Sequence, residues 1–264
     1  MLILLPPSEG KTSPRRGRPL DLASLDFPGL EQHRAEVLDA LVSLCTTDDP
    51  ASAAEVLGLG KTQTGEVAAN ARLADAATAR ADRVYSGVLY ESLDLASLTG
   101  PSKRRATSWL AVTSGLFGLL RLSDRIPAYR LSGDVSLPGV GTVSTYWNKR
   151  LDGTVREAAG QGLVVDLRST TYASFWRPAP DLARRVVTLR VLHESTSGQP
   201  GTRKVVSHFN KATKGRIVRD LLADGTAPRG PARFADHLRS LGWKVEDGPA
   251  DRSGTRLDVV VSEL

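Results

Sequence analysis

The sequence predicts a mixed α/β (α+β) fold, built as a single compact domain with a central mixed sheet and flanking helices. Hydrophobic residues make up 41% of the 264 residues, which is enough for a large buried core. Short apolar runs interleave with helical patterns, without a visible internal repeat. The stretches rich in Gly and Pro are short and indicate surface loops, so we expect residues 1–264 to form one domain.

Runs rich in Val, Leu and Ile predict the strands, and apolar residues that recur every three or four positions predict the helices. The expected strands are residues 2–5, 83–87, 109–113, 163–167, 186–192, 204–208 and 257–262. The expected helices are residues 31–45, 51–57, 62–81, 145–159, 169–176, 211–224 and 231–241. Because helices alternate with strands, we expect the helices to cover a central sheet.

The number of cysteines and the residues at the N-terminus limit the classes to which the protein can belong. Cys45 is the single cysteine, which excludes an internal disulfide framework and multi-cysteine metal sites and fits a reducing cytoplasm. Residues 1–5 are apolar, but two prolines follow, so the run is too short for a signal peptide or a membrane span. The histidines lack the spacing of metal ligands. We therefore expect a cytoplasmic protein with no membrane partner, no metal and no cofactor.

Positive charge is concentrated in one segment of the chain. The protein has 35 Lys and Arg against 29 Asp and Glu, which gives a net charge of +6. Residues 203–219 contain six basic side chains and no acidic one, so the rest of the chain is neutral. A local excess of this kind favours an anionic partner.

Two lysines of this segment fall on the inner face of a predicted helix. A helix that starts near Asn210 has an apolar face around Ile217 and Leu221, and at about 100° per residue Lys211 and Lys214 lie over the same face. Two cations in the first turn oppose the helix dipole at about 0.3–1 kcal/mol each, and a bound anion would offset this cost. Salt bridges to internal carboxylates are the alternative.

The first predicted strand runs into Pro6-Pro7-Ser8-Glu9-Gly10-Lys11-Thr12. The Gly-Lys-Thr ending does not complete a phosphate-binding P-loop, because Leu5 stands where the first Gly is required and the prolines donate no N–H group. Polar residues at the end of a buried strand still mark the edge where α/β proteins form sites. Ser8, Glu9 and Lys11 are therefore candidate functional residues, with a solvated turn as the alternative.

Residues 51–73 predict a short helix, a Gly58-Leu59-Gly60 turn and a longer helix that opens with Lys61. This pattern is typical of a helix-hairpin-helix, whose turn presents backbone N–H groups to a phosphate regardless of base sequence. A plain helical hairpin, in which the glycines only end one helix and form the turn, is the alternative.

Several aromatic residues stand close to basic ones, an arrangement that suits base stacking beside a phosphate clamp. Arg130 follows Tyr129, Lys149 follows Trp147, Arg168 precedes Tyr172, and Lys211 follows Phe209. Arg121 comes directly after the Gly-containing segment 113–120 and adds a further cation. The alternative is that these rings simply fill the core.

Seven segments of the chain form a characteristic set because of their residues and their order. They are Met-Leu-Ile-Leu-Leu-Pro-Pro-Ser at 1–8, Val-Tyr-Ser-Gly-Val at 84–88, Ser-Gly-Leu-Phe-Gly-Leu-Leu-Arg at 114–121, Pro-Ala-Tyr-Arg-Leu at 127–131, Tyr146-Trp147 with Lys149, Val-Val-Asp-Leu at 164–167 and His-Phe-Asn-Lys-Ala-Thr-Lys-Gly at 208–215. Together they resemble the YaaA family of peroxide stress proteins. The resemblance implies a single-domain mixed α/β fold and a cytoplasmic protein that limits iron-driven DNA damage under hydrogen peroxide. It also implies DNA binding through a basic cleft with a helix-hairpin-helix element, here residues 51–73.

We therefore expect a stress protein that binds DNA with little sequence preference. The expected DNA- or anion-binding residues are Gly58, Gly60, Lys61, Arg121, Arg130, Lys149, Arg168, Lys211 and Lys214. The alternative is an enzyme that holds a phosphorylated or carboxylate small molecule, nucleotide-like, in the same Lys/Arg-lined pocket, with chemistry by Lys11, Ser8, Glu9 or Tyr172. A scaffold that binds another protein is a third possibility. A lone Cys45 is a poor redox sensor, so protection against peroxide is expected to be indirect.

Overall fold

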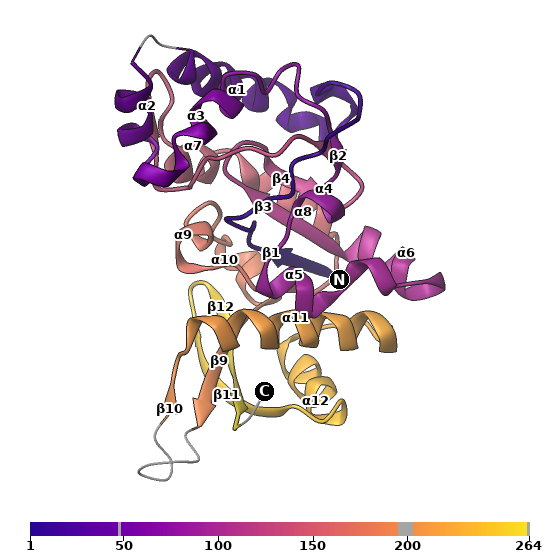
Figure 1. Ribbon diagram of the computed structural model, residues 1–264. Coiled ribbons are helices and arrows are strands. Elements are labelled where there is room, and N and C mark those ends of the chain that lie inside the picture. Colours follow the sequence, from indigo (N-terminus) through magenta and orange to yellow (C-terminus); the bar gives the residue numbers. More distant parts are fainter. Residues whose placement is uncertain (47–48, 195–202, 263–264) are drawn as a thin grey trace.

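One mixed sheet joins strands from both ends of the chain (Figure 1). The structure is a computed structural model and describes residues 1–46, 49–194 and 203–262. The strand order is β11-β12-β9-β8-β1-β3-β4, with β10 paired to β9. These strands are β1 (Leu2–Leu5), β3 (Leu110–Ser114), β4 (Gly118–Arg121), β8 (Val164–Asp166), β9 (Val186–Glu194), β10 (Arg203–Lys204), β11 (Lys244–Asp251) and β12 (Gly254–Val261). Two further pairs join β2 (Ala79–Arg80) to β5 (Arg125–Ile126) and β6 (Ser136–Leu137) to β7 (Gly141–Thr142).

Helices connect the strands and cover the sheet (Figure 1). The α-helices are α1 (Glu31–Cys45), α2 (Pro50–Val56), α3 (Gly65–Asn70), α4 (Ala81–Val84), α5 (Val88–Leu93), α6 (Gly100–Trp109), α7 (Val143–Asn148), α8 (Leu151–Ala159), α9 (Thr170–Ala173), α10 (Pro180–Ala183), α11 (Ser207–Asp224) and α12 (Pro231–Ser240). Single turns of 3₁₀-helix are η1 (Leu22–Ser24), η2 (Pro28–Leu30), η3 (Lys61–Gln63) and η4 (Leu95–Ser97).

Strand directions make the sheet mixed. β3, β1, β8, β9 and β12 run parallel to one another, whereas β4, β10 and β11 are antiparallel to their neighbours. The predicted fold class, a mixed α/β fold with a central mixed sheet, is confirmed. All four residues of β1 are buried, as expected for a strand whose two faces are both covered by helices.

The order of the parallel strands creates a switch in chain direction next to β1. From β1 the chain continues to β3 on one side, whereas β8 lies on the other side and leads to β9 and β12. The connections that follow β1 and β8 therefore leave in opposite directions. In open α/β sheets, a crevice forms outside the carboxyl ends of two such strands, and ligands bind there.

The long helix α11 packs directly against α5, and the two lie side by side in Figure 1. Gly215 makes this close approach possible, because a Cβ atom at that position would lie 2.3 Å from the carbonyl oxygen of Leu89. The first turns of α11 are thereby held beside the crevice at the ends of β1 and β8.

Two expected strands are not extended over most of their length. Residues 83–87 were expected to be extended, but α4 occupies Ala81–Val84, and only Tyr85 makes a single bridge, to Lys11. A short apolar run fits either a strand or a buried helical turn, and here the buried Ala81 and Val84 lie one turn apart. Of residues 204–208, only Lys204 is in a strand, because α11 begins at Ser207; the side chain of His208 lies outside the described part of the chain.

Three expected helices end early or are interrupted. The helix expected over 62–81 ends at Asn70, because residues 79–80 pair with β5 and tertiary pairing overrides the helical preference of alanine. The helix expected over 145–159 is divided into α7 and α8. The helix expected over 169–176 stops at Ala173, and the Arg168 guanidinium binds the carbonyl oxygens of Tyr172 and Trp176.

None of the helices within the described ranges combines the length and the apolar character needed to cross a membrane.

Candidate functional site

Two adjoining cavities open at the carboxyl ends of β1 and β8. We call the first the aromatic pocket; its volume is about 260 Å³, and residues 6–10, residues 86–90, Ser169, Tyr172 and Lys211 line it. We call the second the cationic pocket; its volume is about 450 Å³, and it is lined by residues 167–170 together with Pro6, Leu89, Leu189, Arg190, Val205, Asn210, Lys211 and Lys214. Both cavities lie at the crevice that the strand order predicts.

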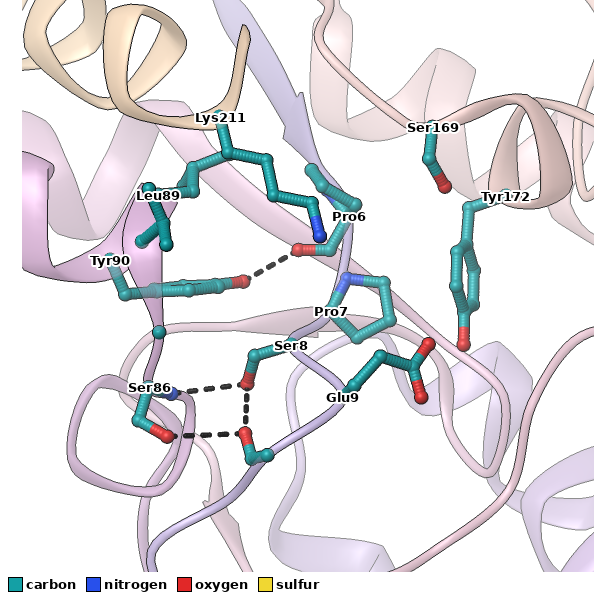
Figure 2. Close-up of a pocket in the computed structure, with 13 residues that line it drawn as sticks. Pro6, Pro7, Ser8, Glu9, Ser86, Leu89, Tyr90, Ser169, Tyr172 and Lys211 are labelled. Atoms are coloured by element: carbon teal, nitrogen blue, oxygen red, sulfur yellow. Dashed lines mark hydrogen bonds between the residues drawn. The ribbon is translucent and has the colours of Figure 1, made fainter. Parts of the chain in front are cut away.

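Two tyrosines and two prolines form the walls of the aromatic pocket (Figure 2). The Tyr90 hydroxyl donates to the Pro6 carbonyl oxygen at 2.7 Å, and its ring stacks on Tyr85 with centroids 5.5 Å apart. The Tyr172 side chain is buried, yet none of the described residues forms a hydrogen bond with its hydroxyl. Burial raises the pKa of Tyr172 far above its ordinary value, so the hydroxyl keeps its proton.

The loop after β1 is fixed in shape by hydroxyl groups (Figure 2). Ser8 Oγ donates to the Gly10 carbonyl oxygen at 2.6 Å and accepts from the Ser86 backbone N–H at 3.0 Å. Ser86 Oγ donates to the same Gly10 oxygen at 3.1 Å. Ser8 is therefore engaged in holding the loop that carries Glu9.

The cationic pocket contains the two lysines of α11. Lys214 is buried, and its ammonium group donates to the Leu167 carbonyl oxygen at 3.2 Å. Burial lowers the pKa of Lys214, while the carboxylate of Asp166 opposes this shift. Lys211, by contrast, is exposed, lines both pockets and makes no ion pair with a described residue. As expected, both lysines face the body of the protein.

The two arginines of the cationic pocket already have carboxylate partners. Arg168 is buried and pairs with Asp166 through Nε–Oδ1 at 2.9 Å and Nη2–Oδ2 at 2.7 Å. Arg190 Nε donates to Asp258 Oδ1 at 2.8 Å. The lysines, rather than these arginines, are therefore the groups of the pocket with positive charge left for an incoming anion.

Lys11 lies behind the aromatic pocket, against a group of tyrosines. Its ammonium nitrogen donates to the Ser8 carbonyl oxygen at 2.8 Å and lies 4.4 Å from the ring centre of Tyr129. Burial lowers the pKa of Lys11 to about 8; Arg130 acts in the same direction and Glu9 against it. An amine with this pKa exchanges protons near neutral pH.

Arg130 reaches the aromatic pocket only through Glu9, whose Oε2 its Nη1 binds at 2.6 Å. The backbone N–H and C=O of Arg130 are both bound by the side-chain amide of Asn70, at 3.0 and 2.8 Å. Glu9, Arg130 and Lys11 thus form one polar cluster beside the pocket, and the positive charge of Arg130 is largely balanced.

Two other predicted residues lie away from these pockets. Arg121 pairs in register with Ala111 at the amino end of β3, and its Nη1 donates to the carbonyl oxygens of Ser108 and Leu110. It therefore lies at the opposite end of the sheet. Lys149 is exposed at the end of α7 and lines neither pocket.

The segment in which the hairpin was predicted contains α2, η3 and α3 around the Gly58–Gly60 turn. The backbone N–H of Gly58 donates to the Glu55 carbonyl oxygen, and that of Gly60 donates to the Gln63 side chain at 3.1 Å. These N–H groups therefore have partners within the chain. The side chain of Lys61 lies outside the described part of the structure.

Sequence reasoning missed Tyr90, Ser86 and Arg190, which the tertiary structure brings to the pockets. Ser86 and Arg190 lie in segments that were expected only to be strands, residues 83–87 and 186–192, and Tyr90 lies in no expected element. Among the described residues, no group of three or more His, Cys, Asp or Glu side chains is placed to hold a metal ion.

Known proteins are similar to this chain over most of its length. The family model described as "Peroxide stress protein YaaA" matches residues 1–243. A UPF0246 protein of Streptomyces coelicolor is 52% identical over 266 residues, covering 100% of both chains. A UPF0246 protein of Corynebacterium efficiens is 42% identical over 93% of this chain and 95% of its own. One from Shewanella loihica is 29% identical over 84% of this chain and 85% of its own.

The fold and the two pockets define an α/β protein with a candidate site at the carboxyl ends of its central strands. The chain belongs to the peroxide stress protein YaaA family, so the resemblance noted in the sequence is confirmed.

Proposed function

We propose that the protein binds a small anionic molecule, phosphorylated or carboxylate, at the carboxyl ends of β1 and β8, and that its part in peroxide stress, in the cytoplasm, depends on this binding. The observation that carries the proposal is that Lys211 and Lys214 both line the cationic pocket without a direct carboxylate partner among the described residues. A buried ammonium group is costly unless it is paired, and an anion in the pocket would supply that pairing.

The size of the site supports a small ligand. The cationic pocket, at about 450 Å³, lies within the range of about 300–1,000 Å³ that is usual for small-molecule sites. Lys214 is buried and Arg130 is bound to Glu9, so neither presents its charge to an open face of the kind that duplex DNA requires.

The proposal is tested by calorimetry with inorganic phosphate and with citrate. We expect the wild type to bind at least one of the two ions, Lys211→Ala to bind it several-fold more weakly, and Lys214→Met to bind it at least tenfold more weakly. Lys149→Ala removes an exposed lysine outside the pockets and serves as the control, with unchanged affinity. No heat of binding with either ion, or equal affinities for all four proteins, would refute the proposal.

A second candidate function is DNA binding, which the position of α3 favours. Asn70 of α3 holds the Arg130 backbone, and the Glu66 carboxylate of the same helix acts on the pKa of Lys11. The second helix of this hairpin therefore lies next to the Glu9–Arg130–Lys11 cluster, and a nucleic acid strand that followed α3 would pass this cluster.

Fluorescence anisotropy with duplex and single-stranded DNA tests this candidate. Affinity is expected to fall steeply between 50 and 200 mM salt, and Lys211→Ala is expected to reduce the salt slope by about 1. Binding that is absent, or unaffected by salt, would exclude the DNA candidate without affecting the small-anion proposal.

A further inference from the structure

The aromatic pocket and the cationic pocket are parts of one continuous site. They share Pro6, Leu89, Ser169 and Lys211 as lining residues. The ammonium group of Lys211 reaches toward Pro6 at this junction (Figure 2). A ligand whose charged end lies in the cationic pocket therefore extends past Lys211 into the aromatic pocket.

The two pockets differ in the chemistry that they offer. Pro6, Pro7, Leu89 and the rings of Tyr90 and Tyr172 give the aromatic pocket flat, apolar walls. In Figure 2, Tyr90 and Tyr172 lie on opposite sides of Pro7. Such walls favour a planar unsaturated ring, which gains from contact with aromatic and proline faces. The cationic pocket offers Lys211 and Lys214, which favour a phosphate.

An unpartnered polar group in the aromatic pocket points to a ring with polar edges. The Tyr172 side chain is 5% exposed, and none of the described residues forms a hydrogen bond with its hydroxyl. The hydroxyl therefore faces the pocket and is free to donate a hydrogen bond, which a ring nitrogen or a carbonyl oxygen of a ligand would accept. A purely hydrocarbon ring would leave it unsatisfied.

We propose that the two pockets together bind one nucleotide unit, with its base against Tyr90 and Tyr172 and its phosphate on Lys211 and Lys214. This inference rests on the anion site proposed above and adds the base. The same chemistry is offered by a free nucleoside monophosphate and by the phosphorylated end of a single strand. The sugar then lies at the junction, beside Pro6 and Ser169.

The test compares ligands that contain one part or both parts of the nucleotide. Calorimetry is carried out on the whole protein with AMP, UMP, adenosine, ribose 5-phosphate and inorganic phosphate. We expect at least one of the two nucleotides to bind tenfold or more tightly than ribose 5-phosphate. A 5′-phosphorylated hexanucleotide and its unphosphorylated form complete the series: tighter binding of the phosphorylated strand than of the mononucleotides identifies a strand end as the ligand, and the opposite order identifies a free nucleotide.

Two variants separate the base from the phosphate. Tyr172→Leu is expected to reduce nucleotide affinity at least tenfold and to leave the affinity for inorganic phosphate unchanged. Tyr172→Phe keeps the ring and its packing on Phe175, and should bind nucleotides several-fold more weakly through loss of the hydroxyl alone. Lys214→Met should weaken the binding of every phosphate ligand. The matched control is again Lys149→Ala.

The outcomes distinguish this inference from the proposed function. If phosphate binds and nucleotides bind no more tightly than ribose 5-phosphate, the base-binding role of the aromatic pocket is wrong and the anion site stands. If neither phosphate nor any nucleotide binds, both are wrong. If Tyr172→Phe remains folded by circular dichroism and binds nucleotides as tightly as the wild type, the assignment of the Tyr172 hydroxyl is wrong.

Discussion

The guanidinium group of Arg168 and the carboxylate of Asp166 form a buried two-bond ion pair behind the cationic pocket, at 2.9 and 2.7 Å. The same guanidinium donates to the carbonyl oxygens of Tyr172, at 3.0 Å, and of Trp176, at 2.8 Å. One ion pair at the end of β8 therefore fixes the segment that carries Tyr172 into the aromatic pocket. A residue expected to bind DNA or another anion acts in the structure as the support of the site.

Removal of the Asp166 charge is expected to destabilise the protein strongly. Asp166→Asn leaves the buried Arg168 without its counter-charge, and loss of one partner of a buried pair costs about 3–5 kcal/mol. The free energy of unfolding, measured by urea titration, should fall by this amount. The control is Glu246→Gln, which breaks an exposed pair with Arg203 and should cost less than about 1 kcal/mol. Similar losses in the two variants would contradict this account.

Lys11 is expected to react with amine reagents at unusually low pH. Its pKa is lowered to about 8, chiefly by burial, so the neutral amine is abundant at pH 8. Site-resolved mass spectrometry after brief acetylation should show half-maximal reactivity of Lys11 near pH 8. Reactivity of Lys11 that reaches half of its maximum only near pH 10.5 would show that Lys11 has an ordinary amine.

Asp124 is expected to make stability decrease between pH 4 and 7. Burial, together with the nearby Asp26 carboxylate, raises the pKa of Asp124 from 3.8 to about 6. Between these values the folded state holds the proton more tightly than the unfolded state, so the free energy of unfolding falls as pH rises and levels off above about pH 6.

The measurement is a comparison of urea unfolding at pH 4 and pH 7 for the wild type and Asp124→Asn. The wild type should lose about 1–3 kcal/mol relative to the variant over this interval. A stability difference between the two proteins that does not change with pH, or that changes in the opposite direction, would contradict the raised pKa of Asp124.

Gly215 is expected to be essential for the close packing of α11 against α5. Gly215→Ala would place a Cβ atom 2.3 Å from the Leu89 carbonyl oxygen, so α11 must move away from α5. We expect a loss of about 1–3 kcal/mol in unfolding free energy, together with weaker binding of phosphate. Gly153→Ala, at an exposed helical position with nothing within 4 Å, should instead stabilise by about 0.4–1 kcal/mol. Equal effects of the two substitutions would show that α11 tolerates the added methyl group.

Much of the fold was predictable from local patterns. The helix expected over 31–45 is α1, because its apolar residues recur with the helical period, and the apolar run at 2–5 is β1, because two prolines end it after one short segment. β4 and β11 were missed. β4 follows β3 after only three residues, and β11 mixes charged residues with Gly248 and Pro249, so neither resembles a buried apolar run.

The candidate site was predictable in part. Lys211 and Lys214 were placed correctly toward the body of the protein by helical spacing alone. Arg121 and Lys149 were grouped with them because they stand near Gly-rich or aromatic segments, yet Arg121 lies at the other end of the sheet and Lys149 lines neither pocket. Proximity in sequence says nothing about which end of a sheet a residue reaches.

The sequence by itself determined that this protein would have a mixed α/β core, a basic segment at residues 203–219 and two lysines on the inner face of one helix. These properties follow from composition and from the periods of strand and helix, which are local. The tertiary structure alone decided that β8 lies beside β1 and that Tyr90 and Tyr172 enclose one pocket. Such contacts join residues more than 80 positions apart, and strand order and long-range packing, rather than local preference, select them.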